Sequence, residues 1–177
     1  LSNYDIAICK MEIAKMLVNT SQMWDASLIF SQVEKEFKND VIGQEAKFEK
    51  IKINYYNGEF EWARSQLNIL KESTFKLIAN NAMELALLIS DNLNLDTSDE
   101  ALSIYANAEL LYRQKKYSDA MALLDSLGNK FPNHSLADEV LFKKADICLS
   151  KSNYSQGIAY LHEIETSFYY DILYDDA

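Results

Sequence analysis

The stretch YANAELLYRQKKYSDAMALLDSLGNKFP, residues 105–132, is followed by a second stretch of the same pattern, FKKADICLSKSNYSQGIAYLHEIETSF, residues 142–168. The two stretches align at a step of 37 positions, which pairs Ala120 with Gly157. A fixed period of this length is the sequence signature of a stacked repeat protein. The repeat, rather than any single motif, therefore predicts the fold.

Each period contains two apolar stripes separated by a polar turn. In the later period, which begins near Ala137, the first stripe consists of Val140, Leu141, Ala145, Ile147, Cys148 and Leu149, and the second of Ile158, Leu161, Ile164 and Phe168. Both follow the 3.6-residue spacing of a helix with one buried face. Between them, residues 152–155 break the pattern and carry the Ser and Asn residues typical of turns and helix N-caps. One period therefore predicts two antiparallel helices.

The same step is found in the first half of the chain, with one interruption. Ala26 and Ala63 are 37 positions apart. Ala63 and Ala120 are 57 positions apart, which is one step of 37 plus 20 extra residues. The extra residues carry an apolar helical stripe of their own over about 78–93. Nine helices are predicted, at about 4–19, 23–37, 42–57, 60–74, 78–93, 98–115, 117–131, 136–151 and 154–168.

The composition favours helices and argues against several classes of partner. The chain has one proline and four glycines, too few for a fold built of tight β-turns. Its formal net charge is −10, so it lacks the basic surface that nucleic acids or anionic membranes require. The sequence has no apolar run long enough to cross a membrane. We therefore expect no nucleic-acid binding and no direct membrane insertion.

The residue types that carry catalysis are sparse and scattered. His134 and His162 have no second histidine or cysteine at ligand spacing, and no nucleophile elbow or phosphate-binding loop occurs. Cys9 and Cys148 lie in apolar helical patterns and are expected to be buried or half-buried thiols. The carboxylates fall where solvated helix faces and N-caps need them. We expect no catalytic site, no metal and no cofactor, and hence no enzymatic activity.

A small residue, an aromatic residue in the turn and a second small residue recur in both later periods. The sets are Ala108, Tyr117 and Ala120, and Ala145, Tyr154 and Gly157. This pattern resembles the tetratricopeptide repeat (TPR), and the 37-residue step is similar to that of large multi-repeat bacterial TPR proteins. The resemblance implies an all-α, right-handed α-α superhelix (a solenoid) of about four helix pairs, with one extra helix inserted near 78–93.

The resemblance also implies repeat boundaries. They are about 3–39, 42–75, 78–132 with the inserted helix, and 136–172, with the start of a further repeat at 173–177. All of 1–177 is expected to form one array that continues beyond the segment. The loop 92–98 is the best candidate for a hinge.

In a TPR array the first helix of each pair lines a concave groove, and the resemblance assigns groove positions by their distance from the small residue. The predicted partner-binding residues are Phe48, Lys52, Tyr55, Tyr56, Tyr105, Glu109, Tyr112, Arg113, Phe142 and Asp146. Aromatic side chains with a polar tip suit protein interfaces. The alternative is that several of these side chains pack against neighbouring helices instead.

Two functions follow from this prediction. The first is a non-enzymatic scaffold that binds a protein or peptide partner through the groove. The alternative is a structural spacer of a larger cytoplasmic or cell-envelope assembly that self-associates through its repeat ends, near Met11 and near residues 169–170. A third hypothesis places a hydrolase in parts of the protein outside this segment. The resemblance implies a bacterial protein of the cytoplasm or of the periplasm and cell envelope, and the sequence does not separate these compartments.

Overall fold

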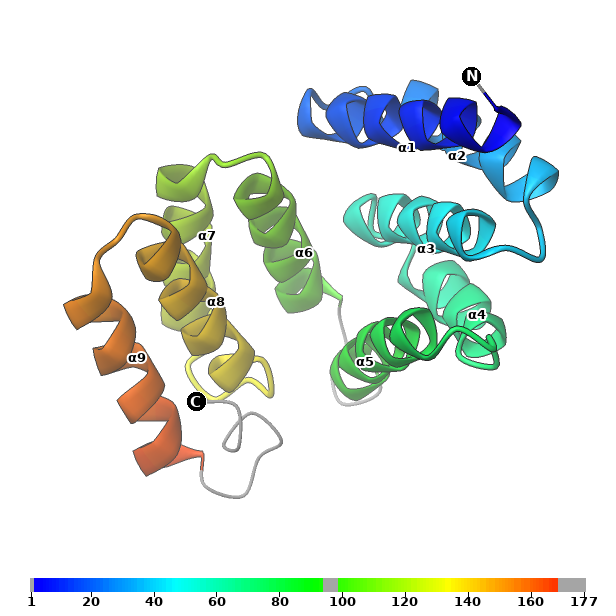
Figure 1. Cartoon of the computed structure of the whole chain (residues 1–177). Coiled ribbons are helices and arrows are strands. Elements are labelled where there is room, and N and C mark those ends of the chain that lie inside the picture. Colours follow the sequence, from blue (N-terminus) through cyan, green and yellow to red (C-terminus); the bar gives the residue numbers. More distant parts are fainter. Residues whose placement is uncertain (1, 94–98, 169–177) are drawn as a thin grey trace. The chain divides into compact units, whose positions relative to one another are not determined.

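The computed structural model describes residues 2–93 and 99–168, and in that part of the chain every regular element is an α-helix (Figure 1). The helices are α1 (Asn3–Asn19), α2 (Met23–Glu36), α3 (Val41–Tyr56), α4 (Phe60–Leu70), α5 (Lys76–Leu93), α6 (Glu100–Arg113), α7 (Tyr117–Lys130), α8 (Ala137–Ser150) and α9 (Tyr154–Ser167). The predicted all-α class is confirmed. Within these described residues, no helix is both long and apolar enough to cross a membrane.

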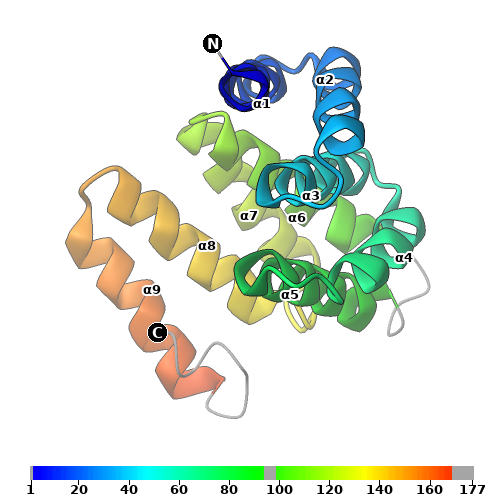
Figure 2. The ribbon, with the colours of Figure 1, turned by 45° about the vertical axis from the view of Figure 1, so that its right-hand side comes forward.

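The chain divides into two compact units, Leu1–Asp91 and Asn92–Ala177. In the first unit α1 pairs with α2 and α3 with α4, and α5 follows. In the second unit α6 pairs with α7 and α8 with α9. Both ribbon views show the members of a pair side by side (Figures 1 and 2). The predicted hinge begins at Asn92, where the second unit starts, and its residues 94–98 lie outside the described part, as does the predicted further repeat at 173–177.

The turn inside each pair has the same backbone geometry in all four pairs. One residue in each turn has positive φ: Ser21 (64°), Gly58 (80°), Lys115 (59°) and Ser152 (58°). The next N–H donates to the carbonyl five residues earlier, for example Asn153 to Cys148 at 2.8 Å and Lys116 to Leu111 at 2.9 Å. This is the Schellman motif, which ends a helix on a left-handed residue. Two of these residues are 37 positions apart in each unit, so the backbone repeats with the period of the sequence.

Three of these four turns place a residue with a Cβ atom in the left-handed conformation, which favours glycine. We therefore predict that Lys115→Gly and Ser152→Gly each raise the free energy of unfolding by about 0.5–1 kcal/mol. Gly58→Ala should lower it by a similar amount, because the alanine would keep φ near 80°. Urea titration followed by circular dichroism measures all three. A loss of stability in both glycine variants would contradict this account of the turns.

Small residues lie where the two helices of a pair approach each other. Ala14, Ala26, Ala63, Ala108 and Ala120 are fully buried, and Ala145 is 1% exposed. At the corresponding position of α9, a Cβ on Gly157 would lie 3.5 Å from the Cys148 Cβ, an ordinary contact distance. No large side chain lies between the helix axes at these positions, so the two helices can pack closely. Larger apolar residues on either side then form the core. The largest fully buried ones include Phe30, Ile51 and Leu67 in the first unit and Leu102, Leu124, Ile147 and Ile164 in the second.

At one point in the first unit, the backbones of two segments are too close together to leave room for the Cβ atom of an alanine. A Cβ built on Gly43, near the start of α3, would lie 1.9 Å from the carbonyl oxygen of Phe37, the residue that caps α2. The obstacle is backbone rather than a side chain that can rotate away. The α2–α3 connection therefore depends on glycine at this position.

Two predicted helix ends are corrected by local geometry. The fourth helix ends at Leu70 rather than near residue 74, and Ser73 N–H donates to the Leu70 carbonyl in the turn that follows. The sixth ends at Arg113 rather than at 115, because Lys115 takes the left-handed conformation of the Schellman turn. Both differences arise from turn hydrogen bonds that the apolar pattern does not encode.

Candidate functional site

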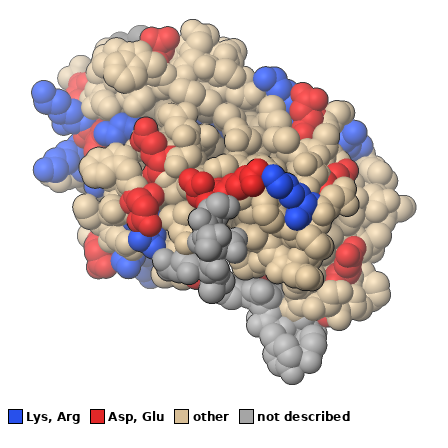
Figure 3. Space-filling view, turned by 180° about the vertical axis from the view of Figure 1, so that it is seen from behind, with Lys and Arg blue, Asp and Glu red and all other residues tan. Residues whose placement is uncertain are grey.

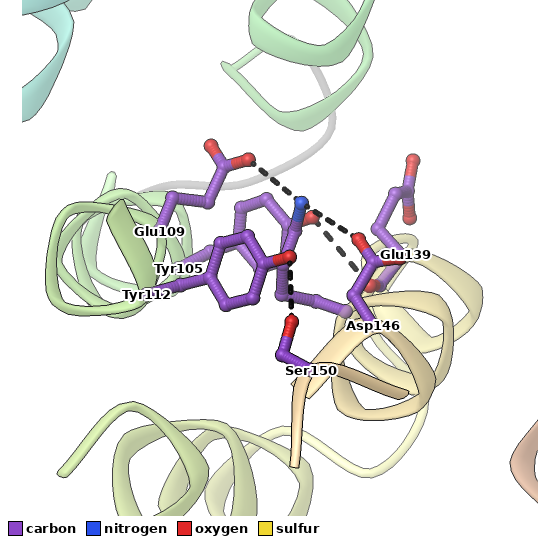
Figure 4. A network of polar contacts seen from close by, with 7 residues as sticks. Tyr105, Glu109, Tyr112, Glu139, Asp146 and Ser150 are labelled. Atoms are coloured by element: carbon purple, nitrogen blue, oxygen red, sulfur yellow. Dashed lines mark hydrogen bonds and ion pairs between the residues drawn. The ribbon is translucent and has the colours of Figure 1, made fainter. Parts of the chain in front are cut away.

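The first helices of the two pairs in the second unit, α6 and α8, contact each other. The Tyr112 hydroxyl lies 3.3 Å from Ser150 Oγ, and the Tyr105 hydroxyl donates to the Glu139 carbonyl at 3.5 Å (Figure 4). The partners in these contacts are 38 and 34 positions apart, about one period. The repeat thus brings equivalent helix faces together. We define the α6–α8 face as Glu109, Tyr112, Phe142, Lys143, Asp146 and Ser150.

Lys143 links the two helices of the α6–α8 face. Its ammonium lies 3.5 Å from Glu109 Oε1 on α6 and 3.4 Å from Asp146 Oδ2 one helical turn further along α8. It also lies 5.3 Å from the centroid of the Tyr112 ring, within cation–π distance. Its side chain is only 17% exposed. One half-buried cation therefore holds two carboxylates and an aromatic ring in place.

The protonation of Lys143 follows from this environment. Burial is the largest single effect and opposes the charged form, but Glu109 and Asp146 together outweigh it, so the pKa of Lys143 is raised above its usual value. Lys143 is therefore an ammonium throughout the physiological pH range. A lysine that acts as a base or nucleophile needs a lowered pKa instead.

Tyr105 lies beneath the α6–α8 face and is only 4% exposed. Burial, and then the negative charges of Glu109, Glu139, Asp146 and Asp138, raise the pKa of its hydroxyl well above the usual value. The group is a neutral phenol that donates a hydrogen bond between the two helices. Its role is to hold α6 against α8.

The first unit has a comparable arrangement on α1 and α3. Lys15 on α1 lies 3.0 Å from Glu45 on α3 and 3.0 Å from Glu12 on its own helix. Desolvation opposes the Lys15 charge, but the two glutamates outweigh it and raise the pKa of Lys15. Further along α3, Lys52 lies 5.7 Å from the centroid of the Phe48 ring. In both units a lysine joins the first helix of one pair to the first helix of the next.

The ten predicted partner-binding residues divide into two groups. Tyr55, Tyr56 and Tyr105 are 1%, 8% and 4% exposed, so their rings are core and are not available to a partner. The Tyr55 ring packs against those of Tyr56 and Phe60, at the turn into α4. The remaining seven are half-buried with part of the side chain at the surface: Phe48, Lys52, Glu109, Tyr112, Arg113, Phe142 and Asp146.

Two polar residues near this face were not predicted. Lys143 lies three positions before Asp146, so the i, i+3 spacing of opposite charges was the available signal. Asp138 is 1% exposed in the first turn of α8. A carboxylate is favoured there by the partial positive charge of the helix N-terminus. The apolar pattern of the sequence gives no sign that Asp138 is buried.

The histidine and cysteine side chains of the described residues do not form a cluster. His162 is exposed and lies 3.0 Å from Glu165 on the same helix. Cys148 is buried as predicted, whereas Cys9 is exposed, which corrects the prediction for that thiol. Within residues 2–93 and 99–168, no three His, Cys, Asp or Glu side chains are grouped so that they could hold a metal ion.

Charged side chains of both signs lie on the face drawn in Figure 3. On the face drawn in Figure 3, basic groups are separated by acidic and uncharged atoms among the described residues. This agrees with the net charge of −10. No protein-family model matches the chain, and no curated protein is significantly similar to it.

Proposed function

We propose that this chain is a TPR-type helical repeat scaffold, without chemistry of its own, in which the pairs stack into a superhelix and the first-helix faces bind a protein or peptide partner. The observation that supports this most is the α6–α8 face, where groove positions predicted from two different repeats lie together. The common Schellman turn in all four pairs supports the repeat assignment.

The α6–α8 face has the properties of a preorganised binding surface. Glu109, Tyr112 and Asp146 each contact Lys143, so their side chains are already ordered before a partner arrives. Binding then costs less side-chain entropy than it would on a surface of free rotamers. Tyr112 and Phe142 offer aromatic area, and the flanking carboxylates offer hydrogen-bond acceptors to peptide N–H groups or basic side chains.

A peptide selection tests the proposal. Random peptides displayed on phage are selected against the chain, and the affinities of the winners are measured by fluorescence anisotropy. We expect Tyr112→Ala and Phe142→Ala each to weaken binding at least tenfold, a loss of about 1.4 kcal/mol. Trp62→Ala is the matched control, because Trp62 is an aromatic residue on α4, 61% exposed and outside the first-helix faces. Its affinity should not change.

Helicity measured by circular dichroism confirms that each variant is folded. Selected peptides that bind both α6–α8 variants as tightly as the unaltered chain would overturn the assignment of this face.

A further inference from the structure

Helix α1 has apolar residues on two opposite sides. The inner side consists of Ala7, Met11, Ala14 and Val18, all buried. The outer face of α1, as we name it, consists of Ile6, Cys9, Ile13 and Met16, all exposed. Ile13 is 51% and Met16 66% exposed. Met11, near which self-association was predicted, points inward and is 2% exposed.

The equivalent face of α3 is covered by the helix that precedes it. The residues 37 positions after the outer face of α1 are Gly43, Ala46, Lys50 and Ile53, all buried or half-buried. Gly43 abuts the backbone of Phe37 at the end of α2, and Lys50 forms an ion pair with Glu34 of α2. In α3, this face is thus the junction between one helix pair and the next.

Helix α8 repeats the same junction in the second unit. The equivalent residues are Ala137, Val140, Lys144 and Ile147, all buried or half-buried. Lys144 corresponds to Lys50, and its ammonium lies 2.7 Å from Asp125 on the preceding helix α7. Two independent junctions therefore place the same four positions of a first helix against the preceding second helix.

The other half of such a junction is uncovered on the last pair. In α7, which packs against α8, Tyr117 and Met121 are half-buried. The residues 37 positions later, Tyr154 and Ile158, are 59% and 63% exposed. Leu149 is 44% exposed, whereas its counterpart Tyr112 is half-buried beside Lys143. We name Tyr154 and Ile158 the outer face of α9, and Leu149 at the end of α8 is exposed as well.

We infer that the outer face of α1 binds the outer face of α9 from a second copy of this chain, reproducing the α7–α8 junction between molecules. The two faces are the complementary halves of a contact that the chain already makes twice. The polar position is substituted on both sides. Ile13 replaces the lysine of the other junctions, and His162 stands at the position of Asp125. Glu165, which stands at the position of Glu34, lies 3.0 Å from His162 of its own helix.

This association joins two different surfaces, so it is heterologous and forms open chains or closed rings of copies. It uses no residue of the α6–α8 face, so its test is independent of the test of peptide binding.

The test uses sedimentation velocity of the whole chain over a hundredfold concentration range. The unaltered chain should show a mass that rises with concentration beyond that of a dimer. Ile13→Lys and Ile158→Lys should each be monomeric, because each variant lacks one half of the junction. An equimolar mixture of the two variants retains one intact pair of faces and should form a heterodimer and nothing larger. Ile69→Lys, at an exposed position on α4, is the control and should associate like the unaltered chain.

Cys9 gives a second readout, since it is exposed within the outer face of α1 and Cys148 is buried. A bulky maleimide on Cys9 should abolish association without any mutation. A chain that stays monomeric at every concentration would overturn the inference, as would an Ile158→Lys variant that still associates, which would indicate an α1–α1 contact. A mixture of folded variants that fails to form the heterodimer would overturn it too.

Discussion

Replacing Gly43 with alanine is expected to lower the free energy of unfolding of the first unit by roughly 3 kcal/mol. The added Cβ would lie 1.9 Å from the Phe37 carbonyl oxygen, so α3 must move away from the end of α2. That movement also separates Lys50 from Glu34 at the same junction. Urea denaturation followed by circular dichroism measures the loss, and the effect should be far greater than the helix-propensity gain of about 1 kcal/mol that alanine brings.

Gly157→Ala is the matched control, because the same substitution is made in a helix that has room for it. The new methyl group would make ordinary contacts, 3.5 Å from Cys148 Cβ and 3.6 Å from the Ala145 carbonyl oxygen. We expect Gly157→Ala to stabilise the chain by about 0.5–1 kcal/mol. Equal effects of the two substitutions would show that the close approach at Gly43 is not what requires glycine.

Replacing Lys143 with methionine is expected to cost about 2 kcal/mol of stability in the second unit. The substitution keeps the apolar stem but leaves the Glu109 and Asp146 carboxylates close together without their cation. Part of the penalty is relieved by solvent, because these carboxylates are 22% and 32% exposed. Thermal and urea denaturation of the variant measure the loss at neutral pH.

The pH dependence gives this second prediction a signature. Because the pKa of Lys143 is raised in the folded state, its contribution is complete below the unfolded pKa, about 10.4, and is lost as the pH rises through the folded value. The difference between the original chain and Lys143→Met should therefore shrink above about pH 10.5. A difference that stays constant above this pH would mean that packing, and not charge, is responsible.

A triple variant separates charge from volume further. Adding Glu109→Gln and Asp146→Asn to Lys143→Met removes the uncompensated charges and should recover most of the lost stability. No recovery in the triple variant would contradict the role given to the ion pairs.

Local signals in the sequence were sufficient for the helices and for the pairing of their faces. Apolar spacing and turn residues act over a few positions, so they predicted the break around Ser152, whereas Tyr154 and Ser155 belong to α9. The resemblance then predicted that Tyr112 and Asp146 belong to one surface, and the structure places both beside Lys143. A sequence repeat can predict contacts between distant residues, because equivalent positions in successive repeats have equivalent neighbours.

Burial of individual side chains was less predictable, because it depends on which helix comes next. Tyr55 and Tyr112 occupy the same position in their repeats, yet Tyr55 is 1% exposed and Tyr112 is half-buried. Tyr55 packs against Tyr56 and Phe60, whereas Tyr112 packs against Tyr117 and lies beside Lys143. The apolar pattern of the sequence predicts the helix face on which a residue lies, and the neighbouring side chains decide how exposed that residue is.

The Schellman turns have a consequence for how such a chain can change its length. Lys115 and Ser152 hold the same left-handed conformation and are followed by the same hydrogen bond to the carbonyl five residues earlier. Removing residues 116–152 would connect α6 directly to α9 through a turn with the same backbone geometry. Duplicating these residues would insert one more pair of helices at the same turn. Whole periods are thus the natural unit of deletion and duplication, since a cut at this turn leaves every remaining helix in phase.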